Sequence, residues 1–335
     1  MITIKHPIEF PNTYPLDRIG PLKDLLFFDI ETTGFSGETS QLYLIGCTYF
    51  DGFGWKLIQW FADTRQAEKE LLDAFFEFLK RFKILIHFNG DRFDIPYLLK
   101  CCERLGLDYH FDDLISIDIF KKIKPYRKLL KLENMKQKSI EQFLGIARTD
   151  KYNGGQLIEV YKDYLMTHEQ NLYDLLILHN EDDLKGMPSI LPILNYPDFL
   201  EHPFTLSDQE IVDEPGTDGR CRHLLKLTCK SFCSIPVPVK ASLSPARCTM
   251  EKDQITFFVE LTEGTLKHFY PDYKDYYYLP FEDRAVHKSI GSCVDKDARV
   301  KATAASCYTK TTGFFLPQFE DIWEPVMKQE YKDKM

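Results

Sequence analysis

The 335-residue sequence contains no apolar run near the ~20 residues that a membrane-spanning helix requires. Its first residues, Met-Ile-Thr-Ile-Lys-His-Pro, lack the basic and then apolar arrangement of a secretory signal. We therefore expect a cytoplasmic protein that makes no contact with a membrane.

Paired cysteines are also missing. The nine cysteines are scattered and odd in number, and Cys101 and Cys102 are sequence neighbours. Cys221, Cys229 and Cys233 fall close together, but no C-x-x-C pair or following histidine pair accompanies them. The sequence therefore does not favour zinc and indicates reduced thiols, as in cytosolic proteins.

Positive charge is in deficit, because the formal net charge is −9. This balance gives no support for nucleic-acid binding through bulk electrostatics, although an acidic metal site would also add negative charge. One basic run stands apart, in which Glu133 is the single acid among Lys121, Lys122, Lys124, Arg127, Lys128, Lys131, Lys136 and Lys138. The run is either a phosphate-binding surface or a solvated helix face, and the sequence does not separate these two interpretations.

What the sequence does contain is a short apolar segment, Leu25 to Ile30, that ends in two acids. Side chains alternate along a strand, so Asp29 and Glu31 share one face, about 6–7 Å apart at Cα. Burying these two charges is costly unless a cation or hydrogen bonds compensate them. The turn Thr32-Thr33-Gly34 comes directly after the strand. The pattern indicates a divalent-metal site at the mouth of a cleft. A strand that merely ends in solvent is the alternative.

Strand candidates at Leu42 to Phe50 and Trp55 to Phe61 predict an antiparallel meander with the first strand. An amphipathic helix over Ala67 to Phe82 and a short strand over Ile84 to Phe88 follow.

A helix is expected over Ile95 to Leu105, and Asp94 stands where its N-cap would be. A capping role is one interpretation of Asp94. The other is that a strand parallel to the first delivers Asp94 to the same cleft, because ligands collect at the carboxyl ends of such strands.

A long helix is expected over Glu169 to Met187. One face of it carries Leu172, Leu176, His179, Asp183 and Met187. This face is apolar except at His179 and Asp183, which are costly to bury without partners. A satisfied core histidine with a surface aspartate is the alternative.

In this order the motifs resemble the DEDD superfamily of 3′-to-5′ exonucleases, which has the RNase H-like fold. They are the D-x-E of Asp29 and Glu31, the N-x-x-x-F-D of Asn89, Phe93 and Asp94, and the late-helix pair His179 and Asp183. The sequence is most similar to the bacterial YprB-type predicted exonuclease family, related to proofreading domains of family B polymerases. The resemblance covers residues 22–192, and Lys138 to Ile146 is also similar to the linker of that group.

This resemblance implies two Mg²⁺ or Mn²⁺ ions, held by Asp29, Glu31, Asp94 and Asp183. Asp29 would bridge both ions, Glu31 and Asp183 would serve the ion on the side of the nucleophile, and Asp94 the other ion.

The resemblance also implies that His179 would orient or deprotonate the attacking water. Substrate contacts would come from Thr32, Asn89 and Phe93. There is one departure from the superfamily, which places a histidine five residues or a tyrosine four residues before the last aspartate. His179 occupies the tyrosine spacing, and Asp182 would be a weaker substitute for Asp183.

The expected organisation is α/β, with a mixed RNase H-like sheet and flanking helices, then a smaller, mainly β second domain. Residues 1–24 are expected to be irregular because of their prolines, residues 25–195 to form the exonuclease domain, and residues 204–335 to form the β-rich domain. Pro188, Pro192, Pro197 and Pro203 are interpreted as a linker.

In the second half, strands are expected at His223 to Cys229, Ile235 to Lys240, Gln254 to Leu261, Thr265 to Tyr270 and Tyr276 to Pro280. Thr262-Glu263-Gly264 is interpreted as a hairpin turn, and Val300 to Tyr308 as helix or strand. Tyrosines interleaved with basic residues between 270 and 301 would suit nucleic-acid binding, with an aromatic core as the alternative.

We therefore expect a two-metal 3′-to-5′ exonuclease that hydrolyses phosphodiester bonds at single-stranded or frayed 3′ ends of DNA or RNA. A catalytically silent RNase H-like binding module is one alternative, against which the four acids speak. An RNase H-like endonuclease is another, and it would cut closed circular nucleic acid.

Overall fold

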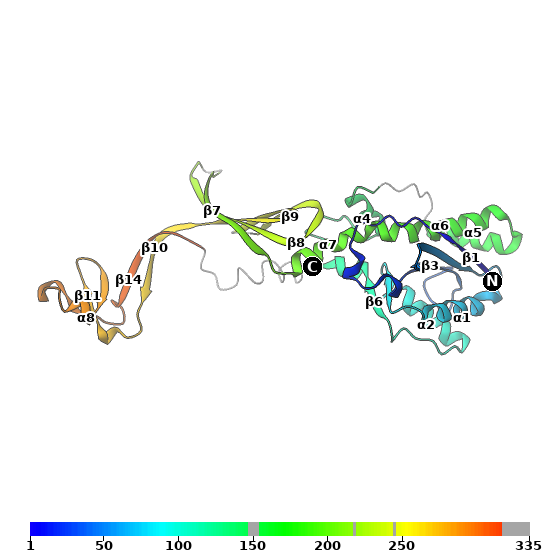
Figure 1. Cartoon of the computed structure of the whole chain (residues 1–335), viewed down its shortest axis with the longest axis horizontal. Coiled ribbons are helices and arrows are strands. Elements are labelled where there is room, and N and C mark those ends of the chain that lie inside the picture. The colour runs from blue at the N-terminus through cyan, green and yellow to red at the C-terminus, as the bar shows by residue number, and fades with distance from the viewer. Residues whose placement is uncertain (147–153, 217–218, 244–245, 317–335) are drawn as a thin grey trace.

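The computed structural model describes residues 1–146, 154–216, 219–243 and 246–316. A mixed α/β region lies at one end of the molecule, and a long antiparallel ribbon connects it to a small distal module at the other end (Figure 1). The predicted fold class, a mixed α/β sheet with flanking helices followed by a mainly β region, is confirmed.

Six strands form the main sheet in the order β1-β4-β3-β2-β5-β6. β2 (Leu25–Thr32), β3 (Leu42–Phe50) and β4 (Trp55–Phe61) form the predicted antiparallel meander. β5 (Ile84–His87) runs parallel to β2, and β6 (Ile115–Asp118) runs parallel to β5. The carboxyl ends of β2, β5 and β6 therefore meet at one edge of the sheet.

Helices cover both faces of this sheet (Figure 1). α1 (Glu68–Leu79) and α2 (Asp94–Leu105) lie on one face, where Phe28 packs on Phe75 with ring centroids 5.9 Å apart. α6 (Gln170–Ile190) crosses the opposite face, where Phe27 and Met187 belong to one core. Because side chains alternate along β2, its two faces supply two separate cores, as expected for a central strand.

The other helices of this region are α3 (Ile119–Ile123), α4 (Gln137–Phe143), α5 (Gly154–Thr167) and α7 (Asn195–Glu201). The basic run from Lys121 to Lys138 begins in α3, directly after β6 ends. All eight of its basic side chains are exposed.

The expectation that residues 1–24 are irregular is wrong at its start. β1 (Ile2–Pro7) pairs with β4 as the edge strand of the sheet. Ile2 and Ile4 point inward and alternate with exposed residues, a pattern that the nearby prolines masked. Pro7 is tolerated because it ends an edge strand, where a missing N–H costs little.

The interpretation of four prolines as a linker is wrong for the first three and holds only for Pro203, which lies in the connection between α7 and the next strand. Pro188 lies inside α6, Pro192 in a 3-10 turn (Leu191–Leu194) and Pro197 in α7, and all three are buried. Pro192 stands at the start of its turn, where a backbone N–H has no partner to lose. These prolines therefore shape continuous helical structure instead of interrupting it.

The ribbon consists of β7 (Thr205–Pro215), β8 (Cys221–Leu243) and β9 (Ala246–Glu260). The two strands expected at 223–229 and 235–240 are parts of the single strand β8. Cys233, Ile235 and Met250 share a core with Phe199 of α7. The predicted boundary between residues 195 and 204 therefore falls inside a continuous core.

The distal module contains β10 (Thr262–Phe269) paired with β14 (Tyr308–Phe315), and β11 (Tyr276–Leu279) between β12 (Arg284–His287) and β13 (Val300–Lys301). The short helix α8 (Lys288–Gly291) follows β12. The hairpin expected at 262–264 is wrong, because these residues open β10 and pair with β14, whereas β9 pairs with β8.

Tyr270 stacks on Tyr276 with ring centroids 4.8 Å apart, against the small buried core of Ala285, Ala302 and Cys307. These tyrosines therefore contribute to an aromatic core.

All nine cysteines lie in described residues and are free thiols. Within the described ranges, no helix has both the length and the apolar character needed to cross a membrane.

Candidate active site

The predicted acidic residues converge at the carboxyl edge of the sheet, where α6 crosses β2. Asp29 and Glu31 lie on β2, and His179 and Asp183 lie one turn apart on α6. His179 Nε2 is 3.7 Å from Glu31 Oε1 and 3.5 Å from Asp183 Oδ2. One donor atom each from Glu31, His179 and Asp183 lies within 4.8 Å of the others. Segments almost 150 residues apart in sequence thus form one cluster.

Asp94 reaches the same edge from α2 and does not cap that helix. The helix begins at Asp94 itself, the residue before it is Phe93, and no side chain caps its first turn. The Asp94 side chain is only 6% exposed. Backbone hydrogen bonds from Asp94 itself and from Ile30 of β2 favour its charged form, which shows how closely it packs on the central strand.

Burial and neighbouring negative charge raise the pKa of Asp29, Glu31 and Asp94. Burial, followed by the charges of Asp94, Glu31 and Asp183, holds the pKa of Asp29 well above its usual range. Burial and the charge of Asp183 raise the pKa of Glu31 to about 8. Burial raises the pKa of Asp94 to about 7. Like charges so close disfavour ionisation, so the group binds either protons or a cation.

The donor set fits hard divalent ions. It consists of carboxylate oxygens with one imidazole, and oxygen ligands are those that Mg²⁺ and Mn²⁺ prefer. A bound cation would offset both the burial and the mutual repulsion of these carboxylates.

A buried amide network, which the sequence analysis missed, holds Asp29. Asn180 is fully buried, and its Nδ2 donates to Asp29 Oδ2 over 2.9 Å. Gln59 Nε2 of β4 donates to Asn180 Oδ1 over 2.9 Å and to the Ile177 carbonyl over 3.1 Å. The detectable signal was the spacing of Leu176, Asn180 and Leu184, which places an amide in the middle of the most buried stripe of α6.

Gly46 on β3 allows this network to form. It is the cross-strand partner of Asp29. A Cβ at position 46 would lie 1.9 Å from Asn180 Oδ1 and 2.5 Å from Leu184. Only glycine therefore permits α6 to approach the sheet closely enough for Asn180 to reach Asp29.

The predicted substrate contacts lie on the loops around the acids. Thr32 Oγ1 donates to the Gly34 carbonyl over 2.7 Å and so shapes the turn after β2. Asn89 has a left-handed backbone with φ of 65°. Phe93 lies with its ring centroid 6.3 Å from that of Phe35, whose side chain is 94% exposed. Sequence reasoning missed Phe35, although an aromatic residue next to the turn was visible.

A second buried network fixes the turn that carries Asn89, Phe93 and Asp94. Asp118, at the end of β6, accepts the N–H of Asn89 over 2.9 Å and that of Asp91 over 3.3 Å. The buried His87 accepts the Gly90 N–H at Nδ1 over 3.0 Å. Burial lowers the pKa of His87, which suits the neutral ring that this bond requires. The network holds the Asp94 loop against β5 and β6.

Comparisons with known proteins agree with this architecture. The family model of the RNase H superfamily matches residues 26–195. The DNA polymerase of Thermococcus kodakarensis is 31% identical over 120 residues, which are 31% of this chain and 7% of that polymerase. The DNA polymerase of Thermococcus sp. strain 9oN-7 is 32% identical over 122 residues, which are 31% of this chain and 16% of that polymerase.

Among solved structures, the family B DNA polymerase of the archaeon Pyrobaculum calidifontis has a TM-score of 0.43 at 15% identity. That similarity covers 52% of this chain and 25% of the polymerase. The chain thus spans only a small part of the polymerases that it resembles.

Proposed function

Because the chain belongs to the RNase H superfamily, we propose that it is a metal-dependent 3′-to-5′ exonuclease that hydrolyses phosphodiester bonds of nucleic acid. The observation that carries the proposal is the convergence of Asp29, Glu31, Asp94 and Asp183, with His179, at one edge of the sheet. Similarity to DNA polymerases supports a nucleic-acid substrate. Membership of the narrower YprB-type family stays a prediction.

In this proposal, Asp29, Glu31, Asp94 and Asp183 hold two Mg²⁺ or Mn²⁺ ions. Such an ion pair supplies Lewis-acid stabilisation of the phosphodiester and activation of the attacking water. The protein's contribution is positional: Asn180 orients Asp29 through its 2.9 Å hydrogen bond, and Tyr43 donates to Glu31 Oε2 over 3.4 Å.

His179 is proposed to hold the attacking water or to accept its proton at Nε2. That nitrogen lies 3.7 Å from Glu31 Oε1 and 3.5 Å from Asp183 Oδ2. A water held between these atoms would therefore contact all three side chains. Proton acceptance by a positioned histidine is the commonest form of general base catalysis.

Phe35 and Phe93 are proposed to stack the terminal base. An exposed aromatic ring beside a second ring is a surface on which any base can stack, whatever its identity. Stacking requires a base that is not paired in a duplex, which favours single-stranded or frayed 3′ ends. Thr32 and Asn89 are proposed to contact the same terminal nucleotide through the turns that they shape.

One basic feature suits the upstream phosphates. The exposed run from Lys121 to Lys138 begins at the carboxyl edge of β6, on the same side as the acids. A cavity of about 370 Å³ opens beside Thr33, but Glu38 and Glu68 line it together with its basic residues, and Glu68 pairs with Arg104 over 2.8 Å. The exposed run is therefore the part proposed to bind phosphates, because lysine and arginine neutralise them.

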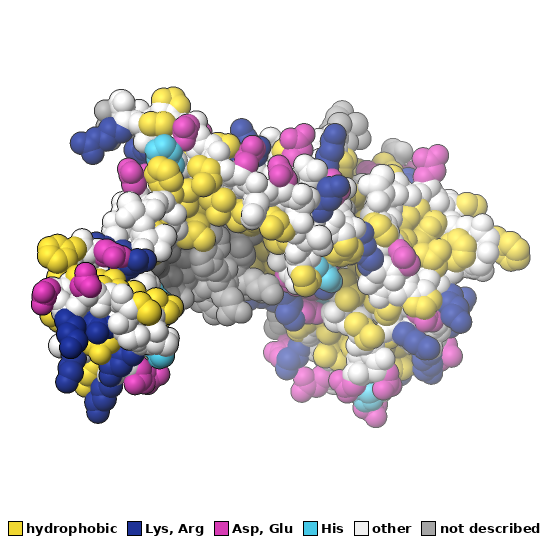
Figure 2. Space-filling view, turned by 60° about the vertical axis from the view of Figure 1, so that its left-hand side comes forward, with side chains coloured by type: hydrophobic (Ala, Val, Ile, Leu, Met, Phe, Trp, Pro, Cys, Tyr) yellow, Lys and Arg dark blue, Asp and Glu magenta, His cyan; other side chains and the backbone are white. Residues whose placement is uncertain are grey.

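The distal module is proposed to make a secondary contact with nucleic acid. Figure 2 shows dark blue Lys and Arg side chains gathered at one end of this module. Its exposed basic residues are Lys267, Lys274, Arg284, Lys296, Lys301 and Lys310. Phe281, on the turn between β11 and β12, is 88% exposed.

The deciding experiment incubates the full-length protein with 5′-labelled DNA and RNA oligonucleotides and Mn²⁺. A ladder of single-nucleotide steps is expected, absent with EDTA and absent for Asp29→Ala. Asp208→Ala, at an exposed acid on the ribbon, serves as the matched control and should behave as wild type. Binding without cleavage would favour the silent module, and equal cleavage of circular and linear single strands would favour an endonuclease.

A further inference from the structure

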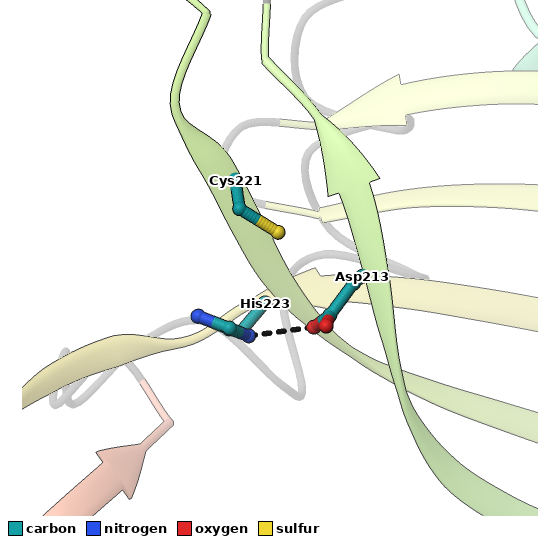
Figure 3. Close-up of side chains that lie close together, drawn as sticks. All are labelled: Asp213, Cys221 and His223. Carbon is teal, nitrogen blue, oxygen red and sulfur yellow. Dashed lines mark hydrogen bonds and ion pairs between the residues drawn. The ribbon is translucent and has the colours of Figure 1, made fainter.

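A second cluster of ligand-type side chains lies beside the turn of the β7–β8 hairpin and shares no residue with the acidic edge (Figure 3). Asp213 of β7 pairs directly with His223 of β8, and Pro215 pairs with Cys221. Because alternate residues of a strand share a face, Cys221 and His223 point to the same side of β8, and Asp213 points to that side from β7.

The three side chains lie close enough to share one ion. One donor atom from each of Asp213, Cys221 and His223 lies within 4.8 Å of the other two. His223 Nδ1 is 2.6 Å from Asp213 Oδ1, and the Cys221 sulfur points toward this pair (Figure 3). The Asp213 side chain is 65% exposed and that of His223 30%, so an ion can enter from solvent.

We propose that Asp213, Cys221 and His223 form a site for Zn²⁺ or a chemically similar ion. Thiolate, imidazole and carboxylate are the ligand types that zinc takes. Tetrahedral zinc with normal bond lengths holds such atoms roughly 3.3–3.6 Å apart, so small side-chain rotations complete the site. Water fills the fourth position. Binding releases the proton of the Cys221 thiol to solvent, as for any thiolate ligand.

The place of the cluster gives such an ion a structural role. The His223 ring packs on Phe314 of β14 with centroids 4.2 Å apart. The His223 carbonyl accepts the N–H of Leu261, the residue between β9 and β10, over 2.8 Å. An ion held by His223 would therefore fasten the hairpin at the joint where the ribbon meets the distal module. The inference does not depend on the nuclease proposal, because it uses other residues and another ligand chemistry.

Co²⁺ binding to the full-length protein distinguishes the proposed site at Cys221 from the proposed metal site at the acidic edge. Co²⁺ substitutes for zinc and absorbs strongly in the near ultraviolet only when a thiolate is among its ligands. The acidic edge offers carboxylates and His179 but no sulfur, so it cannot produce this band. We expect a thiolate band that saturates at one Co²⁺ per chain and that one equivalent of Zn²⁺ removes.

Cys221→Ser should abolish the band, and His223→Gln or Asp213→Asn should weaken Co²⁺ binding at least about tenfold. Cys293→Ser is the matched control, because Cys293 is also exposed but lies in the distal module. Its band should equal that of wild type. A band that survives Cys221→Ser, or no band in the wild-type protein, overturns the proposal.

Alkylation of the wild-type protein tests the site without any variant. Zn²⁺ should protect Cys221 from iodoacetamide and leave Cys293 reactive, as mass spectrometry of the digested protein would show. Equal labelling of Cys221 with and without Zn²⁺ would mean that the cluster is only a histidine–aspartate hydrogen bond with a neighbouring thiol.

Discussion

Asn180 donates a hydrogen bond to Asp29 Oδ2 over 2.9 Å, from the residue next to His179 on α6. The helix α6 therefore supplies His179 and Asp183, which would surround the attacking water in the proposed reaction. It also supplies the Asn180 amide, which orients the Asp29 carboxylate. Its register relative to β2 therefore determines the position of all three side chains.

Asn180→Ala tests this coupling. The change removes the donor to Asp29 and one of the two acceptors of the buried Gln59 amide, whereas the Ile177 carbonyl remains. The loss of a buried hydrogen-bond partner typically costs about 1–3 kcal/mol of stability. We expect kcat to fall about 10²-fold through misplacement of Asp29, with the KM for an oligonucleotide little changed. Asn171→Ala, at an exposed asparagine on the same helix, is the control. Wild-type kcat and an unchanged Mn²⁺ titration in Asn180→Ala would contradict the positioning role.

Gly46→Ala, a change on β3, should also disturb the hydrogen bond between Asn180 and Asp29. The new methyl group would meet Asn180 Oδ1 at 1.9 Å, so α6 must move away from β3. Overpacking of this kind costs about 1–3 kcal/mol, and we expect a lower Tm together with lost cleavage. Gly54→Ala is the matched control, because nothing lies within 4 Å of an added Cβ at that turn. If both variants cleave equally well, the approach of α6 is not set by Gly46.

His179 and Asp183 should differ in their effects on metal binding. Asp183→Asn removes a proposed ligand, so Mn²⁺ affinity and turnover should both fall sharply. His179→Ala should keep most of the Mn²⁺ affinity and lose about 10²–10⁴ in rate, the usual loss when a general base is removed. His179→Tyr should retain more activity than His179→Ala, because the spacing is that of the tyrosine subgroup. Wild-type activity in His179→Ala would assign His179 to packing.

The metal-free protein should lose stability as pH rises. The folded-state pKa of Glu31 is about 8 against an ordinary 4.5, and that of Asp94 about 7 against 3.8. A carboxyl whose pKa is raised on folding binds its proton more tightly in the folded state, so its destabilising effect grows from about pH 4 to pH 8.

In EDTA, the free energy of unfolding should therefore decline across this window, and Mn²⁺ should raise Tm more at pH 8 than at pH 5.5. Glu31→Gln should flatten the profile, because glutamine does not titrate. A pH-independent Mn²⁺ effect on Tm would argue against metal binding at these carboxyls.

Shortening the chain tests how far the ribbon belongs to the first region. Ending the chain at residue 203 removes Cys233, Ile235 and Met250 from the core that they share with α7, so aggregation is expected. Ending it at residue 260 removes the distal module and all residues after it, and this fragment should unfold cooperatively and keep the proposed nuclease centre. A soluble, cooperatively folded 1–203 fragment would show that the shared core is dispensable.

The sequence was informative where periodicity and burial agree. β3 and β4 have the predicted bounds, because both strands are nearly continuous apolar runs closed by turn residues. Asp29 and Glu31 were recognisable because two carboxylates at the end of a buried strand are unusual. Their roles as metal ligands remain predictions.

Prolines caused most of the errors. The strands expected at 223–229 and 235–240 left a gap at residues 230–234, whereas β8 continues through this gap as one strand that also contains Pro236 and Pro238. Its pairing with β9 shifts register between Ile235 and Val239, where irregular pairing accommodates residues without an N–H. Asn180 and Phe35 were missed for another reason. The role of a buried amide or an exposed ring depends on the residues that face it in the fold, and the sequence alone does not show which residues these are.

The ribbon also sets a length. Twelve residues separate His223, at the joint with the distal module, from Ile235, in the shared core. An extended strand of that length reaches at most about 40 Å, which is the rise of about a dozen base pairs of duplex DNA. A nucleic acid that touched both ends of the protein would have to exceed that span. Cleavage rates measured against oligonucleotide length would then level off only beyond it.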